Sequence, residues 1–182
     1  MWASRVTRKI CHIAQVGEPV LRRISKEVTF PLTRSSRKLI GDMKDTLAYE
    51  EGAGLAAIQI RKPSRLFIFD DNGEDVVAIN PEMKPVGTGK GVGWEACLSV
   101  RGLVGRVSRF QHIQVTYFNE EGHRIERELS GFTARVFQHE LDHCHGRVWL
   151  DHVVDRENDV LTEEEFALRV DRGAIPADEQ IA

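Results

Sequence analysis

One segment, residues 132–145, constrains the fold more than any other part of the sequence. At helical spacing its apolar side chains form two stripes, which are Phe132 with Val136, and Phe137 with Leu141 and Cys144. His139 and His143 fall on the first of these stripes. Gly146 follows in the C-terminal capping position. The segment is therefore predicted to be a helix that is buried over much of its circumference.

The middle of the chain predicts antiparallel strands. Residues 66–69 and 76–79 are short apolar runs joined by a turn at Asp71-Asn72-Gly73. Residues 113–118 and 124–129 alternate between polar and apolar side chains around a second turn. Residues 80–94 contain prolines and several glycines, and we expect them to form a loop.

Two further helices complete the expected fold. Residues 36–51 show helical spacing, with Ser35 or Ser36 able to cap the start and Gly52 ending the helix. Thr162 and Glu165 form a capping box that opens a last short helix at about residues 162–171. Strands and helices do not alternate regularly, so we expect an α+β fold in which antiparallel β-sheets pack around a central helix. Residues 1–182 are predicted to form a single domain.

Composition excludes several classes of function. The net charge of −3 gives no electrostatic basis for binding nucleic acid. No apolar run approaches the roughly 20 residues that a membrane span needs. The three cysteines are too few and too scattered for a disulfide framework, which indicates a reducing compartment. The basic start of the chain lacks the apolar core of a secretory signal, so we expect a bacterial cytoplasmic protein, with a mitochondrion or other organelle as the alternative.

The central helix carries a pattern that is typical of metal sites. His139 and His143 are four residues apart, so their imidazoles point the same way and can bind one divalent cation. Glu140 lies beside the first imidazole and can accept a proton from water that the metal activates. A solvated helix face could carry the same residues. The apolar neighbours favour the metal site, because buried histidines need partners.

A catalytic metal site usually has a third protein ligand. Cys97 follows a glycine-rich stretch, and its thiolate suits borderline metals. A buried apolar cysteine is the alternative for this position. His145 points to another face of the helix, whereas His152 lies beyond it and would be the third ligand of a metallopeptidase.

Three segments together resemble the peptide deformylase family. They are residues 52–59 (GAGLAAIQ), 95–99 (EACLS) and 138–146 (QHELDHCHG), in the order of that family's motifs. The resemblance runs from about residue 12 to residue 155. It implies an enzyme that removes the formyl group from the N-terminal formylmethionine of nascent polypeptides and releases formate.

The resemblance also implies roles for particular residues. The metal ligands would be Cys97, His139 and His143, and Glu140 would be the general acid and base. Gln59 and the backbone N–H of Leu98 would hold the developing oxyanion. The substrate would contact Gly52, Ala53, Gly54, Phe132 and Val136. The native metal would be Fe²⁺, with Zn²⁺, Ni²⁺ or Co²⁺ as substitutes, and formylmethionyl peptides and nascent chains would be the partners, with transient contact to the ribosome.

The sequence departs from the family's pattern at two positions. The family usually has glycine where this chain has Ala96, and alanine would be strained there if the position needs a positive φ. It often has proline where this chain has Arg101. These departures affect the expected efficiency and substrate preference rather than the class of reaction.

Three charged side chains near the motifs are expected to have structural roles. Asp142 points away from the histidines, and we predict that it pairs with Arg109 and fixes the helix against a loop. Glu95 is expected to accept hydrogen bonds behind the metal. Arg135 lies either near the substrate pocket or along the solvated side of the helix.

Two other functions stay open from the sequence alone. A metallopeptidase would take its third ligand downstream and give no role to Gln59 or Cys97. A structural metal domain, or an inactive relative that only binds nascent chains, would have no need for a base at Glu140. The sequence makes no prediction about oligomeric state.

Overall fold

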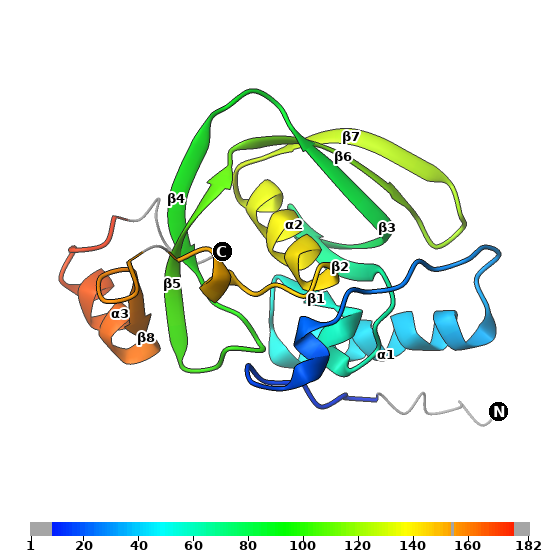
Figure 1. Ribbon diagram of the computed structural model, residues 1–182, viewed down its shortest axis with the longest axis horizontal. Coiled ribbons are helices and arrows are strands. Elements are labelled where there is room, and N and C mark those ends of the chain that lie inside the picture. Colours follow the sequence, from blue (N-terminus) through cyan, green and yellow to red (C-terminus); the bar gives the residue numbers. More distant parts are fainter. Residues whose placement is uncertain (1–8, 154, 177–182) are drawn as a thin grey trace, which may run out of the picture.

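The structure, a computed structural model, describes residues 9–153 and 155–176 and has an α+β fold built on two antiparallel sheets (Figure 1). The larger sheet has the strand order β1 (Gly54–Ala56), β2 (Leu66–Asp71), β3 (Glu74–Pro85), β6 (His112–Phe118) and β7 (Arg124–Ser130). The smaller sheet has the order β4 (Lys90–Glu95), β5 (Leu103–Phe110) and β8 (Val160–Thr162). The helices are α1 (Arg34–Glu50), α2 (Gly131–Cys144) and α3 (Glu163–Asp171), with short 3₁₀ helices η1 (Pro19–Arg22), η2 (Ala57–Ile60) and η3 (Trp149–Asp151).

Strand β2 is buried on both faces, which explains its continuous apolar run. Phe67 and Phe69 pack in the core beneath α2. Leu66 and Ile68 point the other way, into the core that α1 shares with the sheet. Successive side chains of a strand alternate between faces, so a run without polar residues indicates a strand covered on both sides.

Helix α2 lies at the centre of the fold, as the sequence predicts, with its boundaries shifted by one residue. Phe137 packs edge-on against Phe67 and Phe69, with ring centroids 5.0 and 5.3 Å apart. Gly146 ends the helical segment at φ 71°, and a Cβ there would lie 2.7 Å from the carbonyl oxygen of Arg22. Glycine is therefore required at this position both by its backbone angle and by the close approach of η1.

Helix α1 forms where it is expected, but both of its caps differ from the prediction. Thr33, rather than Ser35 or Ser36, is the N-cap, and its side chain accepts a hydrogen bond from the Ser36 N–H. Glu51, rather than Gly52, takes the left-handed conformation that ends the helix, at φ 54°. Thr33 lies just before the first helical residue, so the helical spacing of apolar side chains does not indicate that it is the cap.

The expected loop over residues 80–94 is wrong. Strand β3 continues to Pro85, and β4 begins at Lys90, so only a short turn separates them. Gly91 and Gly93 pair with β5 inside the smaller sheet. A Cβ on Gly93 would lie 3.0–3.3 Å from the guanidinium of Arg135, which covers this strand. The glycines therefore mark a strand that a long side chain crosses closely, and not a loop.

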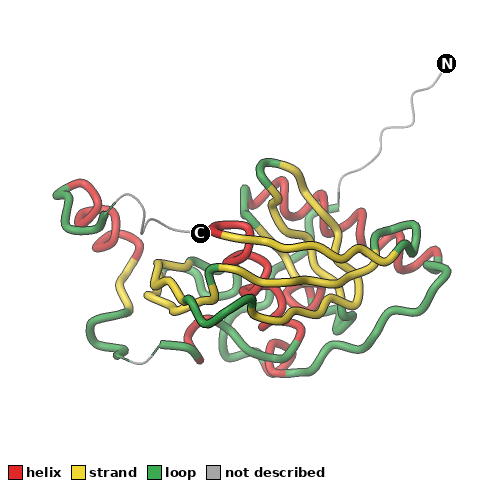
Figure 2. Tube along the Cα trace, turned by 90° about the horizontal axis from the view of Figure 1, so that it is seen from above, coloured by secondary structure: helices red, strands yellow, loops and turns green. Residues whose placement is uncertain are grey.

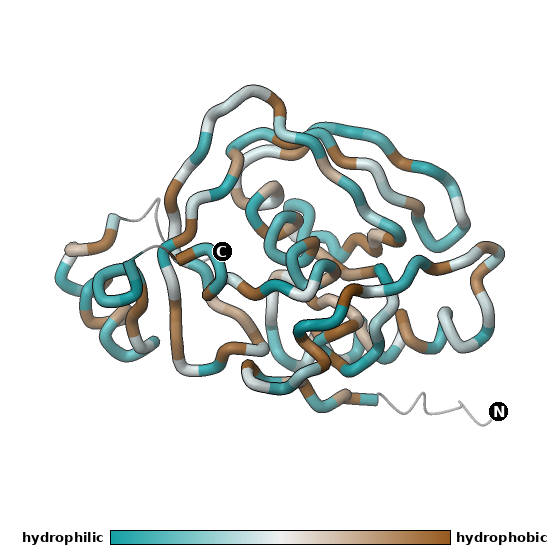
Figure 3. The backbone as a smooth tube through the Cα atoms, viewed as in Figure 1, coloured by the Kyte–Doolittle hydropathy of each residue, from teal (hydrophilic) through white to brown (hydrophobic). Residues whose placement is uncertain are grey.

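The outer elements follow their sequence patterns. Polar and apolar residues alternate along the β6–β7 hairpin (Figure 3). At the other end of the molecule β8 leads into α3 (Figure 2). The ring of Phe166 on α3 packs against that of Trp94 on the smaller sheet. Thr162 caps α3 by accepting a hydrogen bond from the Glu165 N–H. Among the described residues, no helix is long and apolar enough to cross a membrane. The expectation that residues 1–182 form a single domain stays a prediction.

Candidate metal centre

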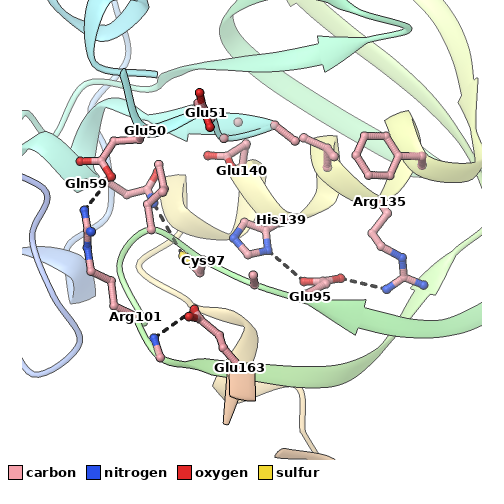
Figure 4. A pocket seen from close by; sticks show the side chains of 18 residues that line it. Glu50, Glu51, Gln59, Glu95, Cys97, Arg101, Arg135, His139, Glu140 and Glu163 are labelled. Atoms are coloured by element: carbon pink, nitrogen blue, oxygen red, sulfur yellow. Dashed lines mark hydrogen bonds and ion pairs between the residues drawn. The ribbon is translucent and has the colours of Figure 1, made fainter. Parts of the chain in front are cut away.

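A cavity of about 520 Å³ opens beside α2, and most of the site residues that the sequence predicts line its walls (Figure 4). Its walls contain the five residues expected to contact substrate, which are Gly52, Ala53, Gly54, Phe132 and Val136. They also contain five residues with expected roles in chemistry, which are Gln59, Cys97, Leu98, His139 and Glu140. His143 is fully buried next to the cavity. Chain segments far apart in the sequence therefore meet at one place.

Cys97, His139 and His143 form a cluster with the geometry of a metal site. Their potential ligand atoms all lie within 4.8 Å of one another. The Sγ atom of Cys97 lies 3.3 Å from Nε2 of His143. These atoms come from α2 and from the segment after β4, and among the described residues they form the one group of this kind. One thiolate and two imidazoles suit a divalent transition metal.

Glu95 determines which nitrogen of His139 is free to bind a metal. Its Oε2 atom lies 2.9 Å from Nδ1 of His139, which places the ring proton on Nδ1 and leaves the Nε2 lone pair for an ion. Burial opposes the charge on Glu95, but the hydrogen bond from His139 and the charge of Arg109 lower the pKa of this carboxyl well below its usual value. Glu95 therefore stays ionised although it is 1% exposed.

The Glu95 carboxylate is held by two arginines, in agreement with its expected structural role. Arg109 donates to it from Nε and Nη2, at 2.9 and 3.0 Å. Arg135 donates from Nη1 at 2.9 Å and also binds the carbonyl oxygens of Gly91 and Val107. Arg135 thus borders the cavity but is neither free in it nor solvated, because its guanidinium joins α2 to the smaller sheet.

The predicted pair between Asp142 and Arg109 is present and buried. The carboxylate lies 2.5 Å from Nη1 of the arginine. Arg109 lies on strand β5, so the pair fixes the helix to a strand and not to a loop. His152 lies with its Nε2 atom 2.7 Å from the same carboxylate, so it faces Asp142. His152 is outside the cluster of Cys97, His139 and His143, so it does not supply the downstream ligand that a metallopeptidase would need.

Glu140 is a buried carboxylate with an unsatisfied oxygen. It is 3% exposed, and its Oε2 atom has no hydrogen-bond partner among the described residues. Burial raises the pKa of this carboxyl to about 7. A Cβ added to Gly54 would lie 2.5 Å from Oε1 of Glu140. Gly54 is thus required for the position of Glu140, in addition to the contact with substrate that the resemblance implies.

The side-chain amide of Gln59 has a fixed orientation. Its Oε1 atom accepts a hydrogen bond of 2.6 Å from the Ala56 N–H, so the amide nitrogen points the other way. That nitrogen lies 3.2 Å from Oγ of Ser99 and 3.7 Å from Sγ of Cys97. Gln59 therefore presents a donor beside the metal cluster. Ser99, whose contact with Gln59 sequence reasoning missed, is fully buried.

A stretch near the N-terminus joins the two segments that carry Gln59 and Leu98. The Ala14 N–H donates to the carbonyl of Gln59 at 2.7 Å. The side chain of Gln15 donates to the carbonyl of Leu98 at 2.9 Å, and the Val16 N–H donates to that of Ser99 at 2.7 Å. Residues 10–30 show no periodic pattern, so nothing in the sequence indicated this role.

Ala96 does not carry the strain that a departure from the family's usual glycine could cause. Its backbone is not among those with positive φ in the described chain, so alanine has no conformational penalty of that kind here. Its side chain packs against the apolar core that Trp94 and Val104 form with α3. Alanine at position 96 is therefore compatible with the position of Cys97 in the cluster with His139 and His143.

Comparison with known proteins identifies one family. The sequence profile of polypeptide deformylase matches residues 10–159. The chain is 40% identical over 154 residues to peptide deformylase 1 of Prochlorococcus marinus, covering 79% of this chain and 80% of that protein. The crystal structure of peptide deformylase from Thermotoga maritima superposes with a TM-score of 0.77 at 36% identity, covering 80% of this chain and 99% of that one. A Met-Ala-Ser-bound class I type b peptide deformylase from Acinetobacter baumannii superposes with a TM-score of 0.76 at 28% identity, covering 81% and 100%.

Proposed function

The chain belongs to the polypeptide deformylase family, and on that premise we propose which of its residues carry out the reaction. It is a hydrolase that removes the N-terminal formyl group from nascent polypeptides. The bond that breaks is a linear amide, between the formyl carbon and the methionine nitrogen, and the products are formate and a free amino terminus. The observation that carries our assignment is the cluster of Cys97, His139 and His143 beside an unpaired buried carboxylate.

We propose that Cys97, His139 and His143 hold a single divalent ion. The donor set fits such an ion, and Glu95 already orients His139 for it. The ion supplies a Lewis acid that polarises the formyl carbonyl and makes water nucleophilic at neutral pH. We propose Fe²⁺ as the native metal, as the family resemblance implies. Zn²⁺, Ni²⁺ or Co²⁺ could substitute, because thiolate and imidazole ligands accept all four ions.

Glu140 acts as the general base and then as the general acid. It accepts a proton from the attacking water as the oxygen bonds to the formyl carbon, and it returns that proton to the leaving nitrogen as the carbon–nitrogen bond breaks. Its pKa of about 7 suits both transfers near neutral pH. The unsatisfied Oε2 atom leaves room for a hydrogen bond to the water or to the leaving amine.

Gln59 and Leu98 stabilise the oxyanion that develops on the formyl oxygen. The amide nitrogen of Gln59 is held toward the cluster by the hydrogen bond that fixes its oxygen to Ala56. The backbone N–H of Leu98, next to Cys97, supplies a second donor. Donors that are already oriented lose no energy to reorganisation, and removal of one such donor typically costs about 3–4 kcal/mol of transition-state stabilisation.

The methionine side chain enters the apolar part of the cavity. Val136 is buried on α2, whereas Phe132 is 46% exposed at the start of that helix. Ala53 lies on the opposite segment, between Gly52 and Gly54. An exposed aromatic ring at the edge of a cavity is a surface that an apolar ligand can cover.

We further propose a cellular setting. The similar proteins named above are bacterial, which supports the bacterial cytoplasm as the location. Nascent chains are the substrates, so transient contact with the ribosome follows, and the charged face of α3 is the surface we propose for it.

The first experiment measures formate release from formyl-Met-Ala-Ser, with anaerobically purified protein loaded with Fe²⁺ or Ni²⁺. We expect turnover by the parent and a loss of about 10²- to 10⁴-fold in kcat for Glu140→Gln, the usual range for general acid–base catalysis. Glu164→Gln is the matched control, because this exposed glutamate lies on α3 outside the cavity. Unchanged turnover in Glu140→Gln would refute the assigned base, and no turnover by metal-loaded parent would refute the function.

A further inference from the structure

A second cavity, of about 480 Å³, lies on another face of α2 and has no part in the mechanism above. Residues of α2, β3 and β5 line it, together with the start of β4. Among the described residues, it shares no lining residue with the cavity beside the metal cluster. Part of its wall is apolar, formed by Met83, Phe110 and Leu141, and the rest is mostly charged or polar. The two cavities are therefore separate places for a ligand.

The charges at the back of this cavity already neutralise one another. Nη1 of Arg109 lies 2.5 Å from Oδ2 of Asp142, and Nε of Arg147 lies 3.2 Å from Oδ1 of the same carboxylate. Arg109 also pairs with Glu95, at 2.9 Å. The two arginines and the two acids thus balance within the protein, so they give the cavity no excess charge.

Two cations at the cavity have no acidic partner. Arg65 and Lys90 line the cavity, and neither forms an ion pair within the part of the chain that is described. Nη2 of Arg65 donates to the carbonyl oxygen of Pro81 at 2.9 Å, and Nζ of Lys90 lies 4.7 Å from the centre of the Phe110 ring. These contacts hold both side chains at the cavity and leave both charges uncompensated.

Two buried nitrogens of the lining residues have no hydrogen-bond partner. They are Nε of Arg65 and Nδ1 of His145, and the statement covers residues 9–153 and 155–176. Buried polar atoms are hydrogen-bonded in the great majority of cases, so each exception needs a physical account. A ligand with acceptor oxygens supplies the missing partner after a small rotation of either side chain. The cavity is therefore better provided with donors than the protein itself uses.

One acid at the cavity opposes this excess of donors. Glu82, on β3, lines the cavity, is exposed, and has no ion pair among the residues that the structure describes. The uncompensated charges are thus those of Arg65 and Lys90 against that of Glu82. Positive charge prevails, and the ligand that fits is an anion.

We propose that this cavity binds a small phosphate-type anion, whose oxygens accept hydrogen bonds from Arg65, Lys90 and His145. Guanidinium and ammonium groups are the usual side-chain donors to phosphate in proteins. Free phosphate and a phosphate ester share this chemistry, and the apolar wall offers a surface for the organic part of an ester. The proposal does not depend on the deformylase reaction, because binding itself is what the test measures.

The test titrates isotopically labelled, Zn²⁺-loaded protein with inorganic phosphate and with phenyl phosphate, and follows the backbone amides by NMR. Chloride keeps the ionic strength constant. We expect saturable shifts at Phe110 and Leu141, which line this cavity, and smaller shifts at Gln59 and Leu98, which line the catalytic one. Tighter binding of phenyl phosphate would identify an organic phosphate as the ligand, and equal binding would identify free phosphate. No saturation below about 10 mM of either anion would overturn the proposal.

Variants assign the affinity to individual residues. Lys90→Gln should raise the dissociation constant for phosphate by roughly three-fold, the scale of one exposed ion pair. Arg65→Gln should raise it by roughly ten-fold or more, because a half-buried guanidinium donates charge-assisted hydrogen bonds. Lys84→Gln and Arg37→Gln are the matched controls. They remove the same charges from exposed residues outside the cavity and should leave the affinity unchanged.

A change in the opposite direction separates the anion site from a general loss of folding. Glu82→Gln removes the unpaired acid and should lower the dissociation constant by roughly three-fold, which a misfolded protein cannot do. Equal weakening in Lys90→Gln and Lys84→Gln would overturn the proposal, since net charge and not the cavity would then be responsible. Shifts confined to Gln59 and Leu98 would also overturn it, because the anion would then bind at the metal centre.

Discussion

At the residue scale, the absence of one Cβ atom gives Glu140 its place. Gly54 lies so close that an added Cβ would meet Oε1, Cγ and Cδ of Glu140 at 2.5–2.9 Å. Gly52, two residues earlier, has more tolerant neighbours, because a Cβ there would meet only the ends of Leu47 and Leu98 at 3.2–3.3 Å. Of the two glycines, only Gly54 is therefore required by a close contact with Glu140.

Gly54→Ala should displace Glu140 and lower kcat by about 10²-fold, the typical effect of moving a catalytic group by about 1 Å. The metal ligands are untouched, so metal content measured by elemental analysis should stay near one ion per chain. Gly52→Ala is the control and should lose much less activity, since flexible leucine side chains can give way. Equal losses in the two variants would show that the contact with Glu140 is not what requires Gly54.

Residues of the site were predictable from sequence where their chemistry depends on local spacing. The histidines four apart, together with their apolar neighbours on the helix, favour a metal site over a solvated helix face. The orientation of Gln59 was not predictable, because it depends on the Ala56 N–H and on Ser99 from another segment. The same holds for Glu95, whose partners come from a neighbouring strand and from α2.

At the element scale, the short helices η1 and η3 are joined by Asp151. Its carboxylate pairs with Arg22 of η1 and accepts a hydrogen bond of 2.9 Å from the Val148 N–H, at the start of η3. Burial alone would raise the pKa of Asp151, but the hydrogen bonds from Arg22 and Val148 outweigh it and lower the pKa. Asp151 is therefore more stable as an anion in the folded chain than in the unfolded chain.

This shift makes part of the stability depend on pH. Because the folded pKa lies below the ordinary value, the contribution is present above about pH 4 and is lost as the pH falls through the folded pKa. Asp151→Asn should destabilise the protein at pH 7 by about 0.5–1 kcal/mol, a small value because both side chains of the pair are partly exposed to solvent. Urea unfolding at pH 7 and at pH 3 measures this. A difference that does not shrink at pH 3 would show that the effect does not come from the carboxylate charge.

Elements were predictable where burial follows a simple period. The aliphatic and aromatic run of β2, the alternation of β6 and the stripes of α2 each match the core that they enter. Strand β4 was mistaken for a loop because its glycines make room for Arg135, a residue about 40 positions away. Such a requirement arises only when two distant segments pack together, so local pattern cannot indicate it.

At the scale of the whole molecule, the metal cluster joins parts that the core does not join directly. Cys97 follows the smaller sheet, whereas both histidines lie on α2, which packs against the larger sheet. An ion bound by all three therefore links the two halves of the fold across the cavity. Any ligand that binds only the folded state stabilises it by mass action.

Metal removal should therefore lower the melting temperature as well as abolish activity. With free metal at about 1,000 times its dissociation constant, the stabilisation is about 4 kcal/mol, which would be lost on complete chelation. Cys97→Ala should have a melting temperature that barely responds to added Fe²⁺ or Zn²⁺, because one of the three ligands is gone. If Cys97 only lay beside the histidines, Cys97→Ala would keep its metal and its metal-dependent shift in melting temperature. Calorimetry of parent and variant, each with and without a chelator, decides between a cysteine that holds the ion and one that merely lies beside it.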